Sequence, residues 1–258
     1  MTIPFYKYQG TGNDFVMIDN RQQLFSKNDT KLVNKICDRK FGIGADGLIL
    51  LENHPEVDFE MVYYNSDGNL SSMCGNGGRC IVAFAKELGV IEDETVFEAV
   101  DGRHEAKIID GIVHLKMQDV KEIVEKENHV FLDTGSPHHV QFENDLENLD
   151  VKKAGSNIRY GKLYGAAGSN INFVKAEGDS FNVRTYERGV EDETLSCGTG
   201  VTAVALAMFH LNKVKKQEVN LNVQGGKLRV TFKKTDSGYE DIYLIGPAQL
   251  VYTGLWLT

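Results

Sequence analysis

Two cysteines, Cys74 and Cys197, each open a glycine-rich turn that leads into an apolar segment. The turns read Cys74-Gly-Asn-Gly-Gly78 and Cys197-Gly-Thr-Gly200. A cysteine at a helix N-terminus has its thiolate stabilised by unpaired N–H groups and by the helix dipole. Stereoinversion at a carbon needs one group that removes a proton and another that returns one to the opposite face. The matched pair predicts this chemistry, whereas a single free cysteine is more often a buried structural thiol.

The backbone N–H groups that follow each cysteine predict an anion-binding turn. Neither turn continues as Gly-Lys-Ser/Thr, so a phosphate-binding loop is disfavoured. A carboxylate bound at both turns fits better, because it would share the negative charge that develops on its own α-carbon when the proton leaves.

Charged and polar residues in neighbouring loops suggest how a substrate could be held. Glu187 and Arg188 could bind the ammonium and the carboxylate of one zwitterion, although a surface ion pair is the alternative. His138 could orient or tune a thiol, although a loop histidine is often incidental. Cys37 and Cys80 lack the glycine-rich context, and we interpret both as structural.

The two cysteine turns belong to a larger internal repeat. Cys74 and Cys197 are 123 residues apart, and the segment 95–102 matches 218–225 at the same offset. A weaker match joins 12–16 to 169–174 at a different offset, which implies an insertion between the copies. A repeat of this size predicts the duplication of a whole domain.

Both turns lead into segments that predict helices, at 79–88 and at about 199–212. Each is apolar on nearly all sides, so each is expected to be a buried central helix wrapped by a curved sheet. A surface helix is expected at 29–39. Strands are expected at 15–19, 47–51, 59–64, 95–100, 106–109, 112–117, 170–174, 181–186, 219–223, 227–232 and 241–245. The charged segment 121–127 is expected to cross between the halves.

Composition places the chain among ordinary globular proteins. Of its 258 residues, 41% are hydrophobic and 25% are charged, which suits two domains. The net charge of −9 argues against a nucleic-acid partner. Four cysteines are too few for a disulfide scaffold in a chain of this length, so we expect a reducing cytoplasm. The spacing of Cys74 and Cys80 does not fit a zinc site, so we expect no metal. We also expect no signal peptide, no membrane span and no membrane partner.

The chain resembles the diaminopimelate epimerases over its whole length. The cysteine turns alone would also suit proline-racemase-like enzymes, but the full set of motifs is specific. That set is Gly12-Asn-Asp-Phe15, Asn65-Ser-Asp-Gly68, Met73-Cys-Gly-Asn-Gly-Gly-Arg79, Ser136-Pro-His138, Tyr186-Glu-Arg-Gly189 and Glu193-Thr-Leu-Ser-Cys-Gly-Thr-Gly200.

The resemblance implies an α/β fold of the α+β type with two duplicated domains, 1–122 and 123–246. Each domain would be a barrel-like mixed sheet around a central apolar helix, with the active site in the cleft between them. A last strand within 247–258, near Gln249–Leu257, would return to the first domain. The implied activity is cofactor-independent epimerisation of LL-2,6-diaminopimelate to the meso form by two-base proton transfer, in lysine biosynthesis. The partner expected is a small amino-acid substrate, with a homodimer left open.

The resemblance also implies a role for each site residue. The catalytic bases would be Cys74 and Cys197, supported by His138 and Glu187. The remaining positions match substrate contacts: Asn13, Asn65, Asn170, Glu187 and Arg188, with Gly75, Asn76, Gly198 and Thr199 in the carboxylate-binding turns.

Two positions depart from the family pattern, at possible contacts with the distal end of the substrate. Ser136 stands where asparagine often precedes Pro-His, and Gly47 stands where glutamine is frequent. Two other functions stay open. One is a racemase or epimerase of proline, hydroxyproline or histidine, and the other is a non-catalytic protein that binds an amino acid.

Overall fold

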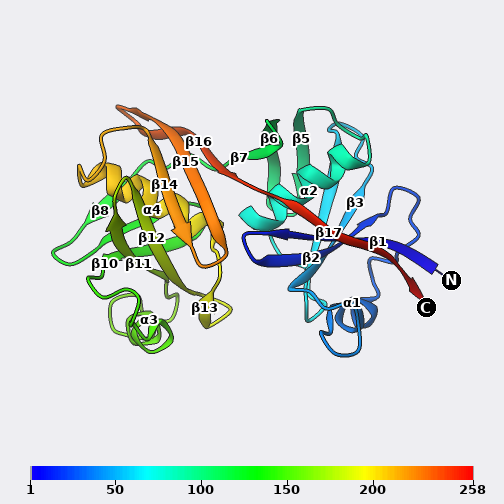
Figure 1. The fold of residues 1–258 in the computed structure, drawn as a ribbon, viewed down its shortest axis with the longest axis horizontal. Helices are drawn as coiled ribbons and strands as arrows, with labels where there is room; N and C mark the ends of the chain where they lie inside the picture. Colours follow the sequence, from blue (N-terminus) through cyan, green and yellow to red (C-terminus); the bar gives the residue numbers. More distant parts are fainter. Residues whose placement is uncertain (1, 258) are drawn as a thin grey trace. The chain divides into compact units, whose positions relative to one another are not determined.

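The computed structural model describes residues 2–257 and groups them into two units. Unit 1 runs to Leu115 and resumes at Gly246, and unit 2 is Lys116–Ile245. Each unit is a mixed β-sheet with few helices (Figure 1). Within residues 2–257, every helix is too short or too polar to cross a membrane.

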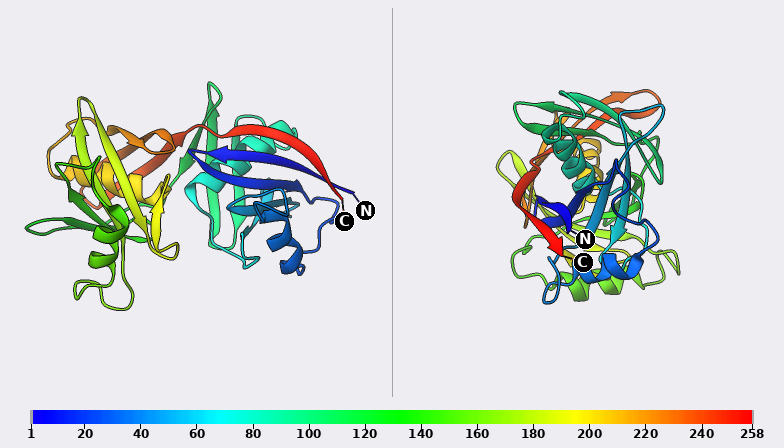
Figure 2. Two further views of the ribbon diagram at one scale, coloured as in Figure 1. Left: turned by 60° about the horizontal axis from the view of Figure 1, so that its bottom comes forward. Right: turned by 90° about the vertical axis from the view of Figure 1, so that its right-hand side faces the viewer.

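The sheet of unit 1 follows the order β17-β1-β2-β3-β4-β5-β6-β7. The pairs β2–β3 and β4–β5 are parallel, and the others are antiparallel. Figure 2 shows β1 and β17 running side by side. The strands are β1 (Thr2–Gly10), β2 (Asn13–Asp19), β3 (Gly47–Glu52), β4 (Phe59–Asn65), β5 (Glu94–Ala99), β6 (Gly102–Ile109), β7 (Ile112–Lys116) and β17 (Gln249–Leu257). Helix α1 (Thr30–Cys37) lies between β2 and β3 in the chain, and α2 (Gly75–Glu87) lies between β4 and β5.

The sheet of unit 2 follows the order β8-β9-β10-β11-β12-β14-β15-β16. The pairs β10–β11 and β12–β14 are parallel, and the others are antiparallel. The strands are β8 (Ile123–Glu125), β9 (Val130–Asp133), β10 (Pro137–Phe142), β11 (Asn170–Glu177), β12 (Ser180–Glu187), β14 (Glu218–Val223), β15 (Gly226–Thr235) and β16 (Gly238–Gly246), with the short β13 (Asp192–Thr194) paired to β12. Helix α3 (Val151–Arg159) follows β10, and α4 (Gly198–His210) precedes β14.

The two units repeat the same sequence of antiparallel and parallel pairs, which confirms the predicted duplication. The register extends the offset of 123 upstream, since Phe15 pairs with Gly47 while His138 pairs with Asn170. The weaker sequence match, 12–16 with 169–174, is therefore wrong. It joins the start of β2 to the start of β11, whose equivalent in unit 1 is β3.

Each unit buries one central helix, as predicted from the apolar segments. Helix α2 packs against β1, β2, β3 and β6, and α4 packs against β9 to β12, β14 and β15. In α4 the side chains from Gly200 to Met208 are all buried. Among the described strands the pairings form an open run in each unit, so the barrel-like sheet does not close.

Of two other expectations, the structure confirms the first and contradicts the second. The predicted surface helix is confirmed as α1, whose N-cap Asp29 accepts a hydrogen bond from the Leu32 N–H. The segment 121–127, expected to cross between the halves, instead contains β8, which pairs with β9 inside unit 2. The predicted domain limits at 122 and 123 stay a prediction.

Candidate active site

Cys74 is the N-cap of α2, and its sulfur takes part in the cap. The Gly77 N–H donates to Cys74 Sγ at 3.2 Å. The Asn13 Oδ1 lies 4.0 Å from Cys74 Sγ and accepts a hydrogen bond from Asn76 Nδ2 at 3.4 Å. The structure thus brings together Cys74, Gly75, Asn76 and Asn13 around one helix N-terminus. An N–H aimed at the sulfur favours its thiolate form.

Arg79 lies directly beneath this turn and is fully buried. Its Nη2 donates to Asn76 Oδ1 at 3.1 Å and to Thr11 Oγ1 at 3.0 Å. Its Nη1 donates to the Gly75 carbonyl at 3.1 Å, and its Nε donates to the Pro247 carbonyl at 3.3 Å. Burial lowers the pKa of Arg79, but a guanidinium stays charged in proteins. The turn around Cys74 therefore contains a buried positive charge.

Cys197 is the N-cap of α4 and is buried. Its Sγ lies 3.6 Å from Thr199 Oγ1, and the Thr199 carbonyl accepts a hydrogen bond from Thr134 at 2.9 Å. A β-carbon at Gly200 would lie 2.5 Å from Asn172 Oδ1, so only glycine fits there. Cys197, Gly198 and Thr199 thus form the first turn of a helix that rests on a buried amide.

His138 sits on β10 below this helix and is completely buried. Asn172 has its Oδ1 fixed as the acceptor from Thr185 Oγ1 at 3.0 Å, so its Nδ2 is the donor to His138 Nδ1 at 3.2 Å. The proton of His138 must then be on Nε2, which has no hydrogen-bond partner among residues 2–257. Burial first, and the Arg188 cation second, lower the pKa of His138 to about 3. The histidine is therefore neutral near pH 7.

Asn170 and Arg188 are also linked in unit 2. The Arg188 backbone N–H donates to Asn170 Oδ1, and Asn170 Nδ2 donates to Ser136 Oγ, both at 2.8 Å. The Arg188 side chain is exposed and reaches the Ala167 carbonyl at 3.2 Å. Glu187 ends β12 and accepts a hydrogen bond from Thr194 Oγ1 at 2.8 Å. These residues form one polar group at the ends of β11 and β12.

Asn65 lies at the end of β4, opposite Gly47, and is exposed. A β-carbon at Gly47 would lie 2.5 Å from the Tyr63 ring and 2.5 Å from the Tyr64 carbonyl. The backbone and the Tyr63 ring thus fill the space into which a side chain at position 47 would extend. This packing accounts for the glycine at that departure from the family pattern.

The other two cysteines are poor nucleophiles. Burial raises the pKa of Cys37 and of Cys80 to about 12 in each case, so both stay protonated thiols near pH 7. This agrees with their interpretation as structural. Within the described residues, no three His, Cys, Asp or Glu side chains are grouped closely enough to hold a metal ion.

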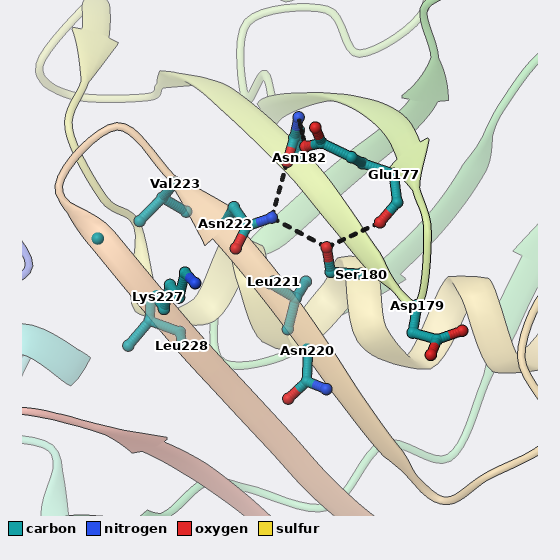
Figure 3. A pocket seen from close by; sticks show the side chains of 11 residues that line it. Glu177, Asp179, Ser180, Asn182, Asn220, Leu221, Asn222, Val223, Lys227 and Leu228 are labelled. Carbon is teal, nitrogen blue, oxygen red and sulfur yellow. Dashed lines mark hydrogen bonds between the residues drawn. The ribbon is translucent and has the colours of Figure 1, made fainter.

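None of the predicted site residues lines a pocket of about 690 Å³ in unit 2 (Figure 3). Some of its polar side chains bond to one another, and Asp179, Asn220 and Lys227 also line it. Asn222 Nδ2 donates to Ser180 Oγ and to Asn182 Oδ1, and Asn182 Nδ2 donates to Glu177.

Comparison with known proteins assigns the family. A family model described as diaminopimelate epimerase matches residues 5–122 and 130–251. The chain belongs to this family. It is 60% identical to a diaminopimelate epimerase of Flavobacterium psychrophilum, over 96% of this chain and 97% of that protein. It is 45% identical to the one of Chlorobaculum tepidum, over 95% and 98% of the two chains. The enzyme is therefore an isomerase, of the epimerase type.

Solved structures of low sequence identity share the fold of this epimerase. A phenazine biosynthesis protein of the PhzF family from Bacillus anthracis matches with a TM-score of 0.80 at 13% identity, over 100% of both chains. A hydroxyproline epimerase from Agrobacterium vitis matches with a TM-score of 0.65 at 14% identity, over 98% of this chain and 92% of that one.

Sequence reasoning did not single out Arg79 or Asn172 of this epimerase. A usable signal was present, because the offset of 123 pairs Arg79 with Thr202 and Ile49 with Asn172. The copies differ in chemistry where a charged side chain replaces an uncharged one, or an amide replaces an apolar one, at an equivalent buried position.

Proposed function

We propose that the enzyme interconverts LL-2,6-diaminopimelate and its meso form, with Cys74 and Cys197 as the two bases. The observation that carries the proposal is the repeat itself, which provides an N-cap cysteine at the same position of two equivalent buried helices. The activity by which the similar relatives are named supports the choice of substrate.

The reaction moves one proton off the α-carbon and another proton on. The thiolate of one cysteine takes the α-proton and becomes a thiol. The thiol of the other cysteine gives its proton to the opposite face and becomes a thiolate. An α-proton of an amino acid is a weak acid, so N–H groups aimed at the substrate carboxylate must stabilise the developing charge. In the reverse direction the two cysteines exchange roles.

The polar residues around each cysteine have proposed roles in binding. The first turns of α2 and α4, at Gly75, Asn76, Gly198 and Thr199, would hold the α-carboxylate through their N–H groups. His138 and Glu187 would support the thiols. The other substrate contacts would be Asn13, Asn65, Asn170 and Arg188, with Glu187 also facing an ammonium group.

Isotope exchange tests the two-base assignment. Wild-type enzyme in D2O should exchange the α-proton of LL-diaminopimelate, followed by proton NMR, and should form the meso isomer, followed by chiral chromatography. A general base contributes about 10²–10⁴-fold, so Cys74→Ser and Cys197→Ser should each epimerise at least about 100-fold more slowly. Cys37→Ala, which removes a thiol outside the site, is the control and should keep the wild-type rate.

An analogue with a leaving group at the β-carbon makes the test stereospecific. Elimination needs only one base, so each serine variant should still eliminate, and the two variants should prefer opposite α-configurations. If either variant epimerises at the wild-type rate, or if both prefer the same configuration, a one-base mechanism replaces this one. Turnover of proline but not of diaminopimelate would instead favour a racemase of another amino acid.

The remaining expectations join the proposal. The enzyme would act without a metal or organic cofactor, so dialysis against EDTA should leave its rate unchanged. It would work in the cytoplasm, in lysine biosynthesis. A homodimer is supported by β17, where the exposed side chains include Leu250, Val251, Leu255 and Leu257. Sedimentation would test the dimer.

A further inference from the structure

Arg79 is a buried cation without an ion pair among residues 2–257. All four of its hydrogen bonds go to neutral oxygens, on Gly75, Thr11, Asn76 and Pro247. A buried charge that lacks a counter-ion is unfavourable, and a nearby group that can become an anion relieves it. The charge on Arg79 therefore favours ionisation of whichever titratable group lies close to it.

Two thiols interact electrostatically with the Arg79 guanidinium, those of Cys74 and Cys80. Cys80 is fully buried, and burial holds its pKa at about 12 although Arg79 acts to lower it. Cys74 is only partly buried, and its sulfur already accepts the Gly77 N–H. The thiol that can ionise and so balance the buried cation is therefore that of Cys74.

Other charges near the Cys74 turn are already paired with each other. Asp14 bonds to Lys7 and Arg39, and Arg39 also bonds to Asp46. Beside the Cys74 turn, Asp101 accepts the Met73 N–H and bonds to His104. On β1, Tyr8 has a raised pKa because of its burial, and is neutral. None of these groups leaves a net positive charge to compete with that of Arg79.

In unit 2 the helix position equivalent to Arg79 is taken by an uncharged residue. Thr202 occupies the position of Arg79 in α4, and it donates to the Gly198 carbonyl at 2.9 Å. The neutral His138 lies on β10, against which α4 packs, and Arg188, the cation that acts on His138, is exposed. Exposed charges act weakly because water screens them.

We propose that Arg79 is a positioning residue that makes Cys74 the thiolate of the free enzyme and leaves Cys197 as the thiol. Arg79 does so through its charge, and through Asn76, whose amide it orients toward Asn13. The free enzyme would then act first on the substrate isomer whose α-proton faces Cys74. This inference refines the proposed two-base function and rests on it.

Alkylation of the free protein tests the inference without substrate. Iodoacetamide reacts with thiolates, so the rate at each cysteine is followed from pH 5 to pH 9 by peptide mass spectrometry, with both cysteines read in the same sample. Cys197 is more buried than Cys74, so the pH midpoint of each rate is compared rather than the rate itself. In the wild type the Cys74 midpoint should lie at least one pH unit below that of Cys197.

Substitution of Arg79 separates its charge from its structural contacts. Arg79→Met should raise the Cys74 midpoint by about 1–3 pH units and leave the Cys197 midpoint in place. Arg79→Lys keeps the charge but loses most hydrogen bonds, and should restore most of the shift. The control is Thr202→Val, at the equivalent position of α4, and it should move neither midpoint.

Three results would overturn the inference. They are a Cys197 midpoint at or below that of Cys74 in the wild type, an unmoved Cys74 midpoint in folded Arg79→Met, and equal midpoints in Arg79→Lys and Arg79→Met. If Arg79→Met does not fold, the wild-type midpoints and Arg79→Lys still decide. The result is also separable from the proposed function, because alkylation needs no turnover. If Cys74 and Cys197 have equal midpoints in a wild-type enzyme that still epimerises, only the role of Arg79 is refuted, and the proposed function stands.

Discussion

The two repeats place a cysteine at the same position of the same buried helix, but they surround it with different side chains. In unit 1 the helix rests on Ile49 and contains the buried cation Arg79. In unit 2 the equivalent positions are Asn172 and Thr202, and a neutral histidine lies below. The backbone scaffold has been kept, while the charge under the cysteine has changed. The proposed two-base reaction, in which one cysteine is a thiolate and the other a thiol, would need a difference of this kind.

The buried histidines of unit 2 predict the largest difference between the repeats, in their response to acid. Burial lowers the pKa of His138 to about 3 and that of His139 to about 4. The unfolded chain binds protons at both residues below about pH 6.5, so unit 2 loses stability as the pH falls from 6.5 toward 4. At pH 5 the loss should be about 2 kcal/mol per histidine.

Unit 1 should lose stability only at lower pH. Burial acts to raise the pKa of Asp14, but hydrogen bonds from Arg39 and Lys7 outweigh it and hold that pKa at about 2. The stability that comes from this lowered pKa of Asp14 is complete above the ordinary pKa of the carboxyl, about 4, and is lost as the pH falls toward 2.

Hydrogen exchange at pH 7 and pH 5, corrected for intrinsic rates, should show β10 and β11 losing protection before β2 and β3. His139→Gln should remove part of the effect, and earlier opening of unit 1 would contradict the comparison.

The glycines one turn into each helix predict a smaller difference. A β-carbon at Gly200 meets Asn172 Oδ1, which is held by a hydrogen bond, whereas one at Gly77 would lie 3.1 Å from the flexible end of Ile49. Gly200→Ala should therefore cost about 2–3 kcal/mol of unfolding free energy. In Gly77→Ala the better helix propensity of alanine offsets most of the crowding, and the cost should be under about 1 kcal/mol. Urea unfolding measures both losses of unfolding free energy. Equal losses would mean that Ile49 and Asn172 limit the space under the two helices to the same extent.

These glycines also show where the sequence could predict the fold and where it could not. The sequence predicts that helix α4 begins near Thr199, and the helix begins at Gly198. The prediction is close because the apolar run follows the cysteine turn directly, from Val201. Helix α2 was predicted from Arg79 but begins at Gly75. Its first turn is glycine-rich because β-carbons at Gly77 and Gly78 would crowd Cys74, Met73 and Leu115. Intrinsic propensity disfavours a helix there, and only the packing of the whole unit overrides it.

The candidate site was predictable in its chemistry but not in its supporting contacts. The cysteine turns are local motifs, so the sequence alone indicates them. The supporting contacts depend on which strands lie under each helix. These are the contacts of Arg79 and Asn172, and those that fix the proton of His138 on Nε2. The register of β10 with β11 brings His138 and Asn172 together from 34 residues apart, and no local pattern encodes that contact.

The exposed cation of unit 2 provides the smallest and sharpest test of the comparison. Arg188 should contact the substrate, whereas the buried Arg79 should act only through Cys74. Arg188→Ala keeps the backbone N–H that holds Asn170, so the fold and the melting temperature should not change. Loss of a charged substrate contact should lower kcat/KM at least tenfold, about 1.4 kcal/mol, in steady-state kinetics. Arg229→Ala, which changes another surface arginine of the same unit, is the control and should retain wild-type kinetics.

Arg188→Ala should also leave the alkylation midpoint of Cys74 unchanged, since a screened surface charge cannot replace a buried one. A shift of that midpoint in Arg188→Ala would mean that both cations control the same thiol, and the contrast between the Cys74 turn and the Cys197 turn would then fail.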